Sequence, residues 1–266
     1  MVALVRRTLG ERSIGHLGTL DPAATGLLVL AIGRKALKVV ELFRDLPKEY
    51  EAEVMLAAVS TTYDAEGTIE KLALKPGWEA PEQAVIQRLL ADRFIGRIAQ
   101  VPPAFSAVHV DGKRAYTLAR QGAGVSLPPR EVEIRRIDIL AYTFPTLRLR
   151  IACGSGTYIR SIAHDLGKLL GCGGYLAGLC RTKVGDWSLA DAVMRDHVTW
   201  ACVRPLKDVL APFPVRSLTA AEFDDVSHGR PIEAEVEANT IGWHDGLPVT
   251  LLEPAGEGMA KPRKVF

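Results

Sequence analysis

Residues 15–26 read GHLGTLDPAATG, and the rest of the chain is organised around this stretch. Three glycines, one proline and two threonines in twelve residues predict a loop rather than a helix or a strand. The loop contains one carboxylate, Asp21, and one imidazole, His16. Because Pro22 disfavours the α conformation at Asp21, we expect the carboxylate to be held in an extended, defined direction.

Two interpretations of Asp21 stay open on the residues alone. A lone acid on a rigid loop is a candidate nucleophile or general base. Alternatively, Asp21 lies in a turn and its side chain caps its own backbone. In either case we expect the apolar run at residues 27–33, LLVLAIG, to be buried and to anchor the loop.

The composition indicates a folded protein of one large domain, or of a large and a small one, because the chain has 266 residues. The 48% of hydrophobic residues exclude global disorder. No apolar run is long enough to span a bilayer, and no basic and apolar leader precedes residue 20. The cysteines show neither CxxC nor zinc spacing, so we expect free thiols in a reducing cytoplasm and neither a metal site nor a disulfide framework.

The net charge is only +2, but it is unevenly distributed. Residues 1–48 contain eight Lys and Arg against four Asp and Glu, and residues 93–160 contain eleven against four. Acidic residues dominate at 49–92 and 213–266. Basic blocks of this kind are typical of proteins that bind a polyanion such as RNA. A solvated surface with a chance fluctuation of charge is the alternative.

The hydrophobic pattern predicts a mixture of helices and strands, and therefore an α/β or α+β architecture. Helices are expected at residues 1–12 with an end at Gly10, at 35–46, at 81–95 and at 158–170. Strands are expected at residues 50–59, 106–110, 131–140, 145–153 and 179–184, the third and fourth of these as a candidate pair. After a proline-rich boundary near residue 212, the remaining chain is acidic and rich in predicted strands.

Several polar residues have both a structural and a functional interpretation. Arg160 falls in the first turn of a predicted helix, against the helix dipole, so we expect a carboxylate partner; a surface arginine is the alternative. Lys113, Arg114 and Arg120 surround Tyr116, a pattern that suits nucleic acid binding but also a solvated helix face.

The stretch at residues 15–26 resembles the catalytic motif of the tRNA pseudouridine synthase B family. The resemblance covers nearly the whole chain, from about residue 4 to residue 266. Four further segments agree with that family in the same order, namely residues 50–52 with 61–67, 100–107 with 112–116, 153–160, and 179–182.

This resemblance implies a pseudouridine synthase fold, with a mixed, largely antiparallel sheet flanked by helices. Residues 1–212 would form the catalytic domain, with an insertion at about residues 100–124 that closes over RNA. Residues 213–266 would form a small C-terminal β domain of the RNA-binding PUA type. Members of the family begin earlier, with a strand and a Lys-Pro-x-Gly turn, so either the start codon is misassigned here or this piece is missing.

The resemblance also implies an isomerase that converts uridine to pseudouridine at position 55 in the T-loop of tRNA. The expected partner is the T-arm of tRNA, with no membrane, no obligatory protein partner and no metal or redox cofactor, in the cytoplasm. Two alternatives remain: a guide-RNA-dependent pseudouridine synthase, and a non-catalytic RNA-binding or RNA-folding protein.

The catalytic carboxylate of the family corresponds to Asp21, which would attack either ribose C1′ or uracil C6. Arg160 would pair with Asp21, keep it ionised and fix its direction. The target uridine lies inside the folded T-loop, so it must be flipped out of the stack.

The other residues that the resemblance implies would bind the flipped nucleotide. His16 would enter the RNA and occupy the space that the nucleotide leaves. Tyr50 would stack on the base, and it is the candidate acceptor of the C5 proton, although at the start of a strand it also suits a core aromatic. Tyr158 would pack near the base or hold Arg160, and Leu179, which otherwise suits a core position, would line the base pocket.

Overall fold

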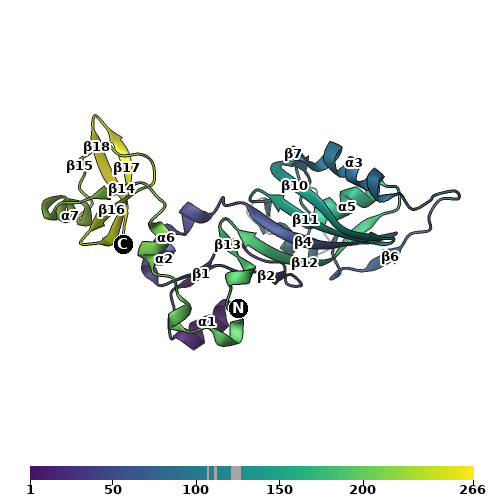
Figure 1. Ribbon diagram of the computed structural model, residues 1–266, viewed down its shortest axis with the longest axis horizontal. Coiled ribbons are helices and arrows are strands. Elements are labelled where there is room, and N and C mark those ends of the chain that lie inside the picture. The colour runs from purple at the N-terminus through teal and green to yellow at the C-terminus, as the bar shows by residue number, and fades with distance from the viewer. Residues whose placement is uncertain (107, 111–112, 121–126) are drawn as a thin grey trace. The chain divides into compact units, whose positions relative to one another are not determined.

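The computed structural model describes residues 1–106, 108–110, 113–120 and 127–266 (Figure 1). The chain forms two compact units, and each unit combines stretches that are separate in the sequence. Each unit also has hydrophobic core clusters of its own. Unit 1 contains Met1–Thr19, Val29–Arg44 and Val193–Phe266, and unit 2 contains Leu20–Leu28 and Asp45–Ala192.

Unit 2 is built on a seven-stranded sheet with the order β13-β12-β4-β11-β10-β7, in which β2 also pairs with β12. The β2–β12 pair is parallel and the other pairs are antiparallel, which confirms the expected mixed, largely antiparallel sheet. The strands are β2 (Thr25–Gly26), β4 (Lys48–Leu56), β7 (Gly96–Gln100), β10 (Arg130–Thr143), β11 (Thr146–Cys153), β12 (Gly174–Val184) and β13 (Trp187–Ser188).

One face of this sheet is apolar because side chains alternate along each strand. In β4 every second residue from Tyr50 to Leu56 is buried, and β11 repeats the pattern from Leu147 to Cys153. The helices α3 (Gln83–Phe94) and α5 (Ile159–Leu169) contribute buried side chains to the same core cluster. Both helices lie on the same side of the sheet (Figure 1).

The backbone of helix α5 lies so close to β12 that no side chain would fit between them. A Cβ atom on Gly167 of α5 would lie 2.1 Å from the backbone nitrogen of Gly174, the first residue of β12. Glycine at this position therefore lets the helix backbone touch the strand. The contact fixes α5, and with it Arg160 in its first turn, relative to the sheet.

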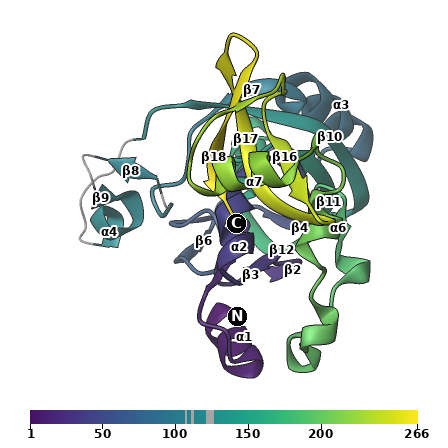
Figure 2. The same ribbon diagram turned by 90° about the vertical axis from the view of Figure 1, so that its left-hand side faces the viewer.

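Two smaller β pairs extend unit 2. The pair of β5 (Ala58–Ser60) and β6 (Ile69–Lys71) follows β4, and the insertion after β7 contains β8 (His109–Val110), β9 (Lys113–Arg114) and α4 (Ala115–Arg120). Figure 2 shows β8, β9 and α4 grouped together. The side chains of Lys113, Arg114 and Arg120 lie outside the described part of the chain, so the expected basic cluster around Tyr116 stays a prediction.

Unit 1 contains a five-stranded sheet with the order β14-β16-β17-β18-β15 and a separate antiparallel pair, β1 with β3. Its strands are β1 (Ile14–His16), β3 (Leu30–Ile32), β14 (Val215–Ser217), β15 (Ile232–Glu233), β16 (Thr240–His244), β17 (Leu247–Gly256) and β18 (Met259–Val265). Its α-helices are α1 (Val2–Leu9), α2 (Arg34–Val39), α6 (Leu206–Leu210) and α7 (Ala220–Ser227).

The structure confirms most of the expected elements and the fold class. The helix α1 ends at Gly10 in a left-handed conformation, and β10 and β11 form the expected antiparallel pair. Two details differ from the expectation: Ala57, with a φ of 63°, divides the strand expected at residues 50–59, and α7 occupies a region expected to be strand-rich. The division of the chain at residue 212 stays a prediction.

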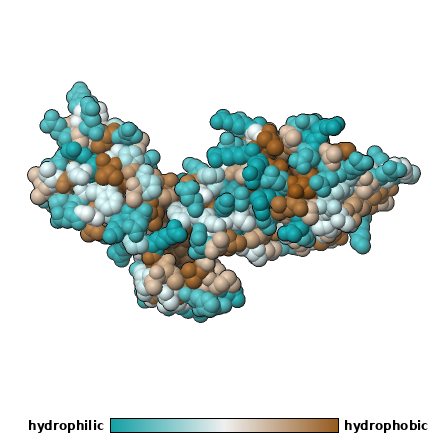
Figure 3. Space-filling model, viewed as in Figure 1, coloured by the Kyte–Doolittle hydropathy of each residue, from teal (hydrophilic) through white to brown (hydrophobic). Residues whose placement is uncertain are grey.

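Hydrophilic side chains cover much of the visible surface, and smaller apolar patches lie between them (Figure 3). Of the helices that the structure describes, none is both long enough and apolar enough to cross a membrane.

Candidate active site

Asp21 lies on the loop of unit 2 that runs from Leu20 to Leu28. The backbone carbonyl of Asp21 accepts a hydrogen bond from the amide of Ala24 at 2.9 Å, which closes a turn over Pro22. The loop then pairs with β12 through Thr25 and Gly26. The sequence therefore folds here into a tight turn that is anchored to a central strand.

Gly26 allows this anchoring because it has a φ of 97°, which L side chains rarely adopt. A Cβ atom at this position would lie 2.3 Å from the backbone oxygen of Arg181. The next residue, Leu27, donates its amide to the same Arg181 oxygen at 2.8 Å. The Asp21 loop is thus bonded to β12 through main-chain atoms, which limits its freedom to move.

The carboxylate of Asp21 is paired with Arg160, as expected from the sequence. Arg160 Nη2 donates to Asp21 Oδ1 at 3.2 Å, and Arg160 Nε lies 2.9 Å from Asp21 Oδ2 in ionic contact. The side chain of Arg160 is only 6% exposed, whereas that of Asp21 is 39% exposed. The pair therefore combines a buried, fixed cation with a carboxylate that remains accessible to a substrate.

Arg160 has a second carboxylate partner, Asp64, whose Oδ2 lies 3.3 Å from Arg160 Nη1. Asp64 is 8% exposed and accepts hydrogen bonds from the Thr62 hydroxyl and from the Glu66 amide. Arg160 also donates to the backbone oxygens of Thr62 at 3.2 Å and Phe105 at 3.1 Å. The guanidinium thus joins the Asp21 loop, the turn after β5 and the start of the insertion.

This arrangement suits nucleophilic or base chemistry at Asp21. Two carboxylates share one arginine, and the buried one accepts two hydrogen bonds from its own turn at Oδ1 while its Oδ2 contacts Arg160. The exposed one accepts a hydrogen bond at Oδ1 and is in ionic contact with the guanidinium at Oδ2, so the cation fixes the direction of the carboxylate. The alternative interpretation, in which the Asp21 side chain caps its own turn, does not fit, because the backbone carbonyl closes that turn while the carboxylate contacts Arg160.

Tyr50 lies on β4 and belongs to the main core cluster, with 8% of its surface exposed. Burial raises the pKa of its hydroxyl, while the charge of Arg181 and a hydrogen bond with Arg181 act in the opposite direction. The charge of Asp21 makes a further, smaller contribution to the higher pKa of Tyr50. Because the net shift is upward from 10, Tyr50 is a neutral phenol near pH 7.

Tyr158 immediately precedes α5 and is held by Gln100, a side chain with 3% exposure. The Tyr158 amide donates to Gln100 Oε1 at 2.8 Å, and Gln100 Nε2 donates to the Tyr158 carbonyl at 3.1 Å. The Tyr158 side chain packs against a small cluster in and beside the insertion, formed by Val108, Ala115 and Leu127. Tyr158 therefore links the insertion to the helix that carries Arg160.

Leu179 is half-buried on β12 and packs against the main core cluster. Its backbone oxygen accepts a hydrogen bond from the Thr25 hydroxyl at 3.2 Å, so it also helps to hold the Asp21 loop. His16 belongs to unit 1, where it is exposed at the end of β1. The expected contacts of both side chains with RNA stay predictions.

Three residues with contacts at this site had no role in the sequence analysis: Asp64, Gln100 and Arg181. All three lie within the motif segments quoted there, but each has a partner that is distant in the chain, Arg160 in the case of Asp64. Gln100 and Tyr158, for instance, are 58 positions apart. A buried acid within the turn-rich residues 61–67 was the signal that could have identified Asp64.

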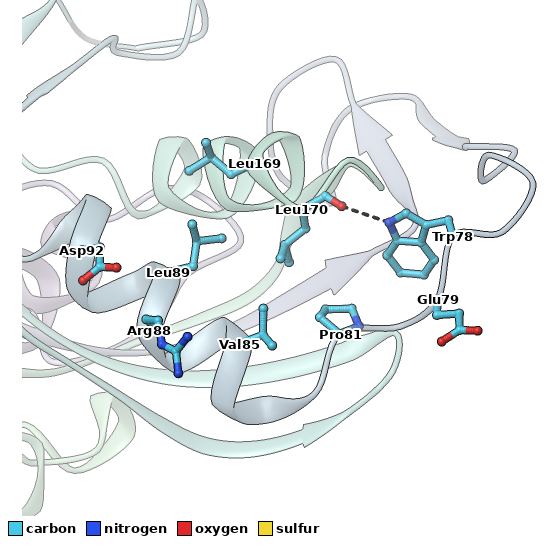
Figure 4. Close-up of a pocket in the computed structure, with 9 residues that line it drawn as sticks. All are labelled: Trp78, Glu79, Pro81, Val85, Arg88, Leu89, Asp92, Leu169 and Leu170. Carbon is cyan, nitrogen blue, oxygen red and sulfur yellow. Dashed lines mark hydrogen bonds between the residues drawn. The ribbon is translucent and has the colours of Figure 1, made fainter.

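A pocket of about 410 Å³ lies elsewhere in unit 2, between α3 and α5 (Figure 4). Trp78 borders it and donates its indole N–H to the Leu170 backbone oxygen at 3.0 Å. Aliphatic side chains of Val85, Leu89 and Leu169 form much of its wall. None of the expected site residues lines it. Within the described residues, no group of three His, Cys, Asp or Glu side chains is placed to hold a metal ion.

Solved structures similar to this chain share its fold. One is a structure of an H/ACA RNP bound to a substrate RNA containing 2′-deoxyuridine, with a TM-score of 0.69 at 20% identity over 100% of this chain and 80% of that chain. Another, a Cbf5-Nop10-Gar1 complex, has a TM-score of 0.68 at 22% identity over 99% of this chain and 79% of that chain.

Closer relatives are found by sequence. The tRNA pseudouridine synthase B of Thermobifida fusca is 42% identical over 100% of this chain and 93% of its own length. That of Xylella fastidiosa is 36% identical over 99% of this chain and 89% of its own length. Residues 6–159 match the N-terminal domain model of the TruB family of pseudouridylate synthases, and residues 160–213 match the C-terminal domain model of tRNA pseudouridylate synthase B. The chain therefore belongs to the TruB family of pseudouridylate synthases.

Proposed function

We propose that this protein isomerises uridine to pseudouridine in tRNA, at position 55 of the T-loop, with Asp21 as the catalytic carboxylate. The observation that carries the proposal is the pair of Asp21 and Arg160, in which a buried cation orients an accessible carboxylate. Membership of the TruB family supports the same reaction. It does not favour a non-catalytic RNA-binding protein or a guide-RNA-dependent enzyme.

The reaction breaks the bond between N1 and C1′ of uridine, turns the base and forms a bond between C5 and C1′. The proton on C5 is released to water, and one proton is bound at N1, so the product is an isomer of the substrate. Asp21 attacks either C1′ of the ribose or C6 of the uracil. Arg160 aligns the carboxylate for this step, and Asp64 contacts Arg160 at Nη1.

The remaining roles concern the flipped nucleotide. Tyr50 stacks on the base, and base–aromatic stacking of about 1–3 kcal/mol offsets part of the cost of unstacking. His16 fills the space that the nucleotide leaves, and Leu179 lines the base pocket. Tyr158 holds the start of α5, since Gln100 fixes its backbone.

The substrate is the T-arm of tRNA, and the reaction needs neither an obligatory protein partner nor a metal or redox cofactor. We place the protein in the cytoplasm. The free thiols of Cys153, Cys172, Cys180 and Cys202 suit a reducing compartment.

The test is the release of tritium from a tRNA transcript whose uridines carry tritium at C5. We expect release by the parent chain and none by Asp21→Asn, with binding of the transcript retained in both. Release by both proteins would remove Asp21 from the mechanism. Binding without release in both would contradict the enzymatic function and favour the RNA-binding alternative.

A further inference from the structure

Arg181 is among the largest fully buried side chains of the protein, with 1% of its surface exposed. A buried guanidinium is costly unless hydrogen-bond acceptors surround it. One acceptor is the backbone oxygen of Leu27, which receives the Arg181 Nε–H at 2.8 Å. Leu27 lies near the end of the loop that carries Asp21, which runs from Leu20 to Leu28. The buried cation therefore contacts the backbone of the loop that carries Asp21 directly.

A second acceptor is Tyr50. Arg181 on β12 lies opposite Tyr50 on β4 in the antiparallel ladder, so both side chains project from the same face of the sheet. The guanidinium charge acts on the Tyr50 hydroxyl, and the two groups share a hydrogen bond. Arg181 thus contacts both the backbone of the Asp21 loop and the hydroxyl of the tyrosine expected to meet the base.

The chemistry of the guanidinium fixes the polarity of this hydrogen bond. Arginine has five N–H donors and no acceptor, so the Tyr50 oxygen must be the acceptor. The hydroxyl proton then points away from Arg181 and remains free to be donated to another group. A donor that itself accepts a charged hydrogen bond is polarised and becomes a better donor.

We propose that Arg181 is a positioning residue for Tyr50: it holds the phenol oxygen as an acceptor, so that the Tyr50 proton, in the plane of its ring, is left to a polar atom at the edge of the bound uridine. This inference rests on the proposed function. When the bond between N1 and C1′ breaks, the electron pair leaves with the base, and the negative charge spreads over the uracil ring. A preorganised donor next to that ring stabilises the charge as it develops.

A double-mutant cycle tests whether Arg181 acts through the Tyr50 hydroxyl. Single-turnover tritium release is measured with saturating protein for the parent, Arg181→Met, Tyr50→Phe and the double variant. We expect Arg181→Met to slow the reaction by about tenfold to a hundredfold when Tyr50 is present. In the Tyr50→Phe background the same change should cost less than about threefold, because the hydroxyl is already absent. Equal losses in both backgrounds would overturn the proposal.

A titration of the free protein gives a second readout, which would not change if Arg181 had only a structural role. The tyrosinate absorbance of Tyr50 is obtained as the difference between each protein and its Tyr50→Phe partner. Removing Arg181 should raise the pH at which Tyr50 ionises, since the charge and hydrogen bond that favour the phenolate are lost. The other groups that act on Tyr50, Asp21 and the Cys153 thiol with its pKa of about 11, stay the same in both proteins. An unchanged titration would contradict the contact.

Two further variants keep the outcome interpretable. Lys183→Met makes an equivalent change on the same strand at an exposed side chain paired with Glu49, and it should leave the single-turnover rate unchanged. If Arg181→Met does not fold, Arg181→Lys takes its place in the cycle, with a smaller loss that still depends on Tyr50. If the parent releases no tritium, the proposed function fails, whereas the tyrosinate titration still decides whether Arg181 holds Tyr50.

Discussion

At the scale of single residues, the site is defined by one arginine between two carboxylates. Arg160 contacts Asp21 on the accessible side and Asp64 on the buried side. Because a guanidinium cannot lose its proton in a protein, it remains a cation throughout a reaction cycle. Its position is set by both carboxylates together with the backbone oxygens of Thr62 and Phe105.

The role of Asp64 leads to the first prediction. Asp64→Asn keeps the shape of the side chain but removes the charge in contact with Arg160 Nη1, so the guanidinium is held less firmly, by Asp21 and two backbone oxygens. We expect single-turnover tritium release to slow by about tenfold to a hundredfold, with tRNA affinity changed by less than about threefold. Asp138→Asn is the control, because Asp138 pairs with Arg136 at an exposed position. A loss of affinity without a loss of rate would contradict this assignment.

Gly26 gives the second prediction, through a matched pair of glycines with positive φ. Gly26→Ala would place a Cβ against the Arg181 backbone, whereas Gly171→Ala, at a φ of 72°, meets no atom within 4 Å. We expect a loss of unfolding free energy of roughly 3–5 kcal/mol for Gly26→Ala, and of about 1–2 kcal/mol for Gly171→Ala. Urea denaturation measures both. Equal losses would mean that the backbone contact with β12 does not constrain the loop.

At the scale of elements, the start of α5 is where distant segments meet. Gln100 at the end of β7 holds Tyr158 by two hydrogen bonds, and the Ser161 hydroxyl donates to the Val101 carbonyl at 2.8 Å. The insertion follows directly after these residues, and its Phe105 carbonyl reaches Arg160. The element that presents Arg160 is therefore fixed by the strand that leads into the insertion.

Gln100→Met tests this link as the third prediction. The substitution preserves the volume of the buried side chain and removes both hydrogen bonds with the Tyr158 backbone. We expect a loss of about 2–4 kcal/mol of unfolding free energy. We also expect a slower single-turnover rate, since Arg160 follows Tyr158 by two residues. Gln87→Met is the control, because Gln87 is exposed on α3. A variant as stable and as active as the parent would show that Gln100 does not position α5.

The sequence predicted the elements that depend on local pattern. Alternation identified β4, β10 and β11, and the glycine-rich segment before residue 158 located the start of α5. The helix α7 was not predicted, although Thr219 and Glu222 form a capping box that marks its start. The positive φ of Ala57 escaped it as well, because nothing local requires that conformation.

Part of the site was also predictable from local sequence pattern. Asp21 lies on a loop of recognisable composition, and Arg160 opposes the helix dipole, so each residue drew attention by itself. Their pairing spans 139 positions, and the contacts of Asp64 with Arg160 and of Arg181 with Leu27 also join distant parts of the chain. Contacts of this kind arise from strand order and helix packing, which local pattern does not contain.

At the scale of the whole molecule, pH acts on stability through His164, which stacks on Tyr63 with ring centroids 3.8 Å apart. Burial lowers the pKa of His164 below its usual 6.5, with Asp165 opposing and Lys168 reinforcing the shift. The unfolded chain therefore binds a proton more readily than the folded one. The contribution of His164 to stability is complete above about pH 6.5 and decreases as the pH falls towards the folded pKa.

The fourth prediction concerns His164→Gln, which tests the sign of this pH dependence because glutamine does not titrate. Urea denaturation at about pH 7.5 and about pH 5 gives the difference in stability between parent and variant at each pH. We expect the parent to lose stability relative to His164→Gln as the pH falls. A difference that stays constant would show that His164 has the same proton affinity in the folded and unfolded chain. Burial raises the pKa of Asp165, which works in the opposite direction but from a lower starting value of 3.8.

The two units are interleaved along the gene rather than placed one after the other. Leu20–Leu28 carries Asp21 into unit 2, while Met1–Thr19 and Val29–Arg44 on either side belong to unit 1. An exon or recombination fragment that begins at Asp45 would encode the sheet and Arg160 without the carboxylate. A fragment that begins at Leu20 would have to include the unit 1 segment Val29–Arg44. A single fragment that carries both Asp21 and Arg160 therefore always carries part of unit 1 with it.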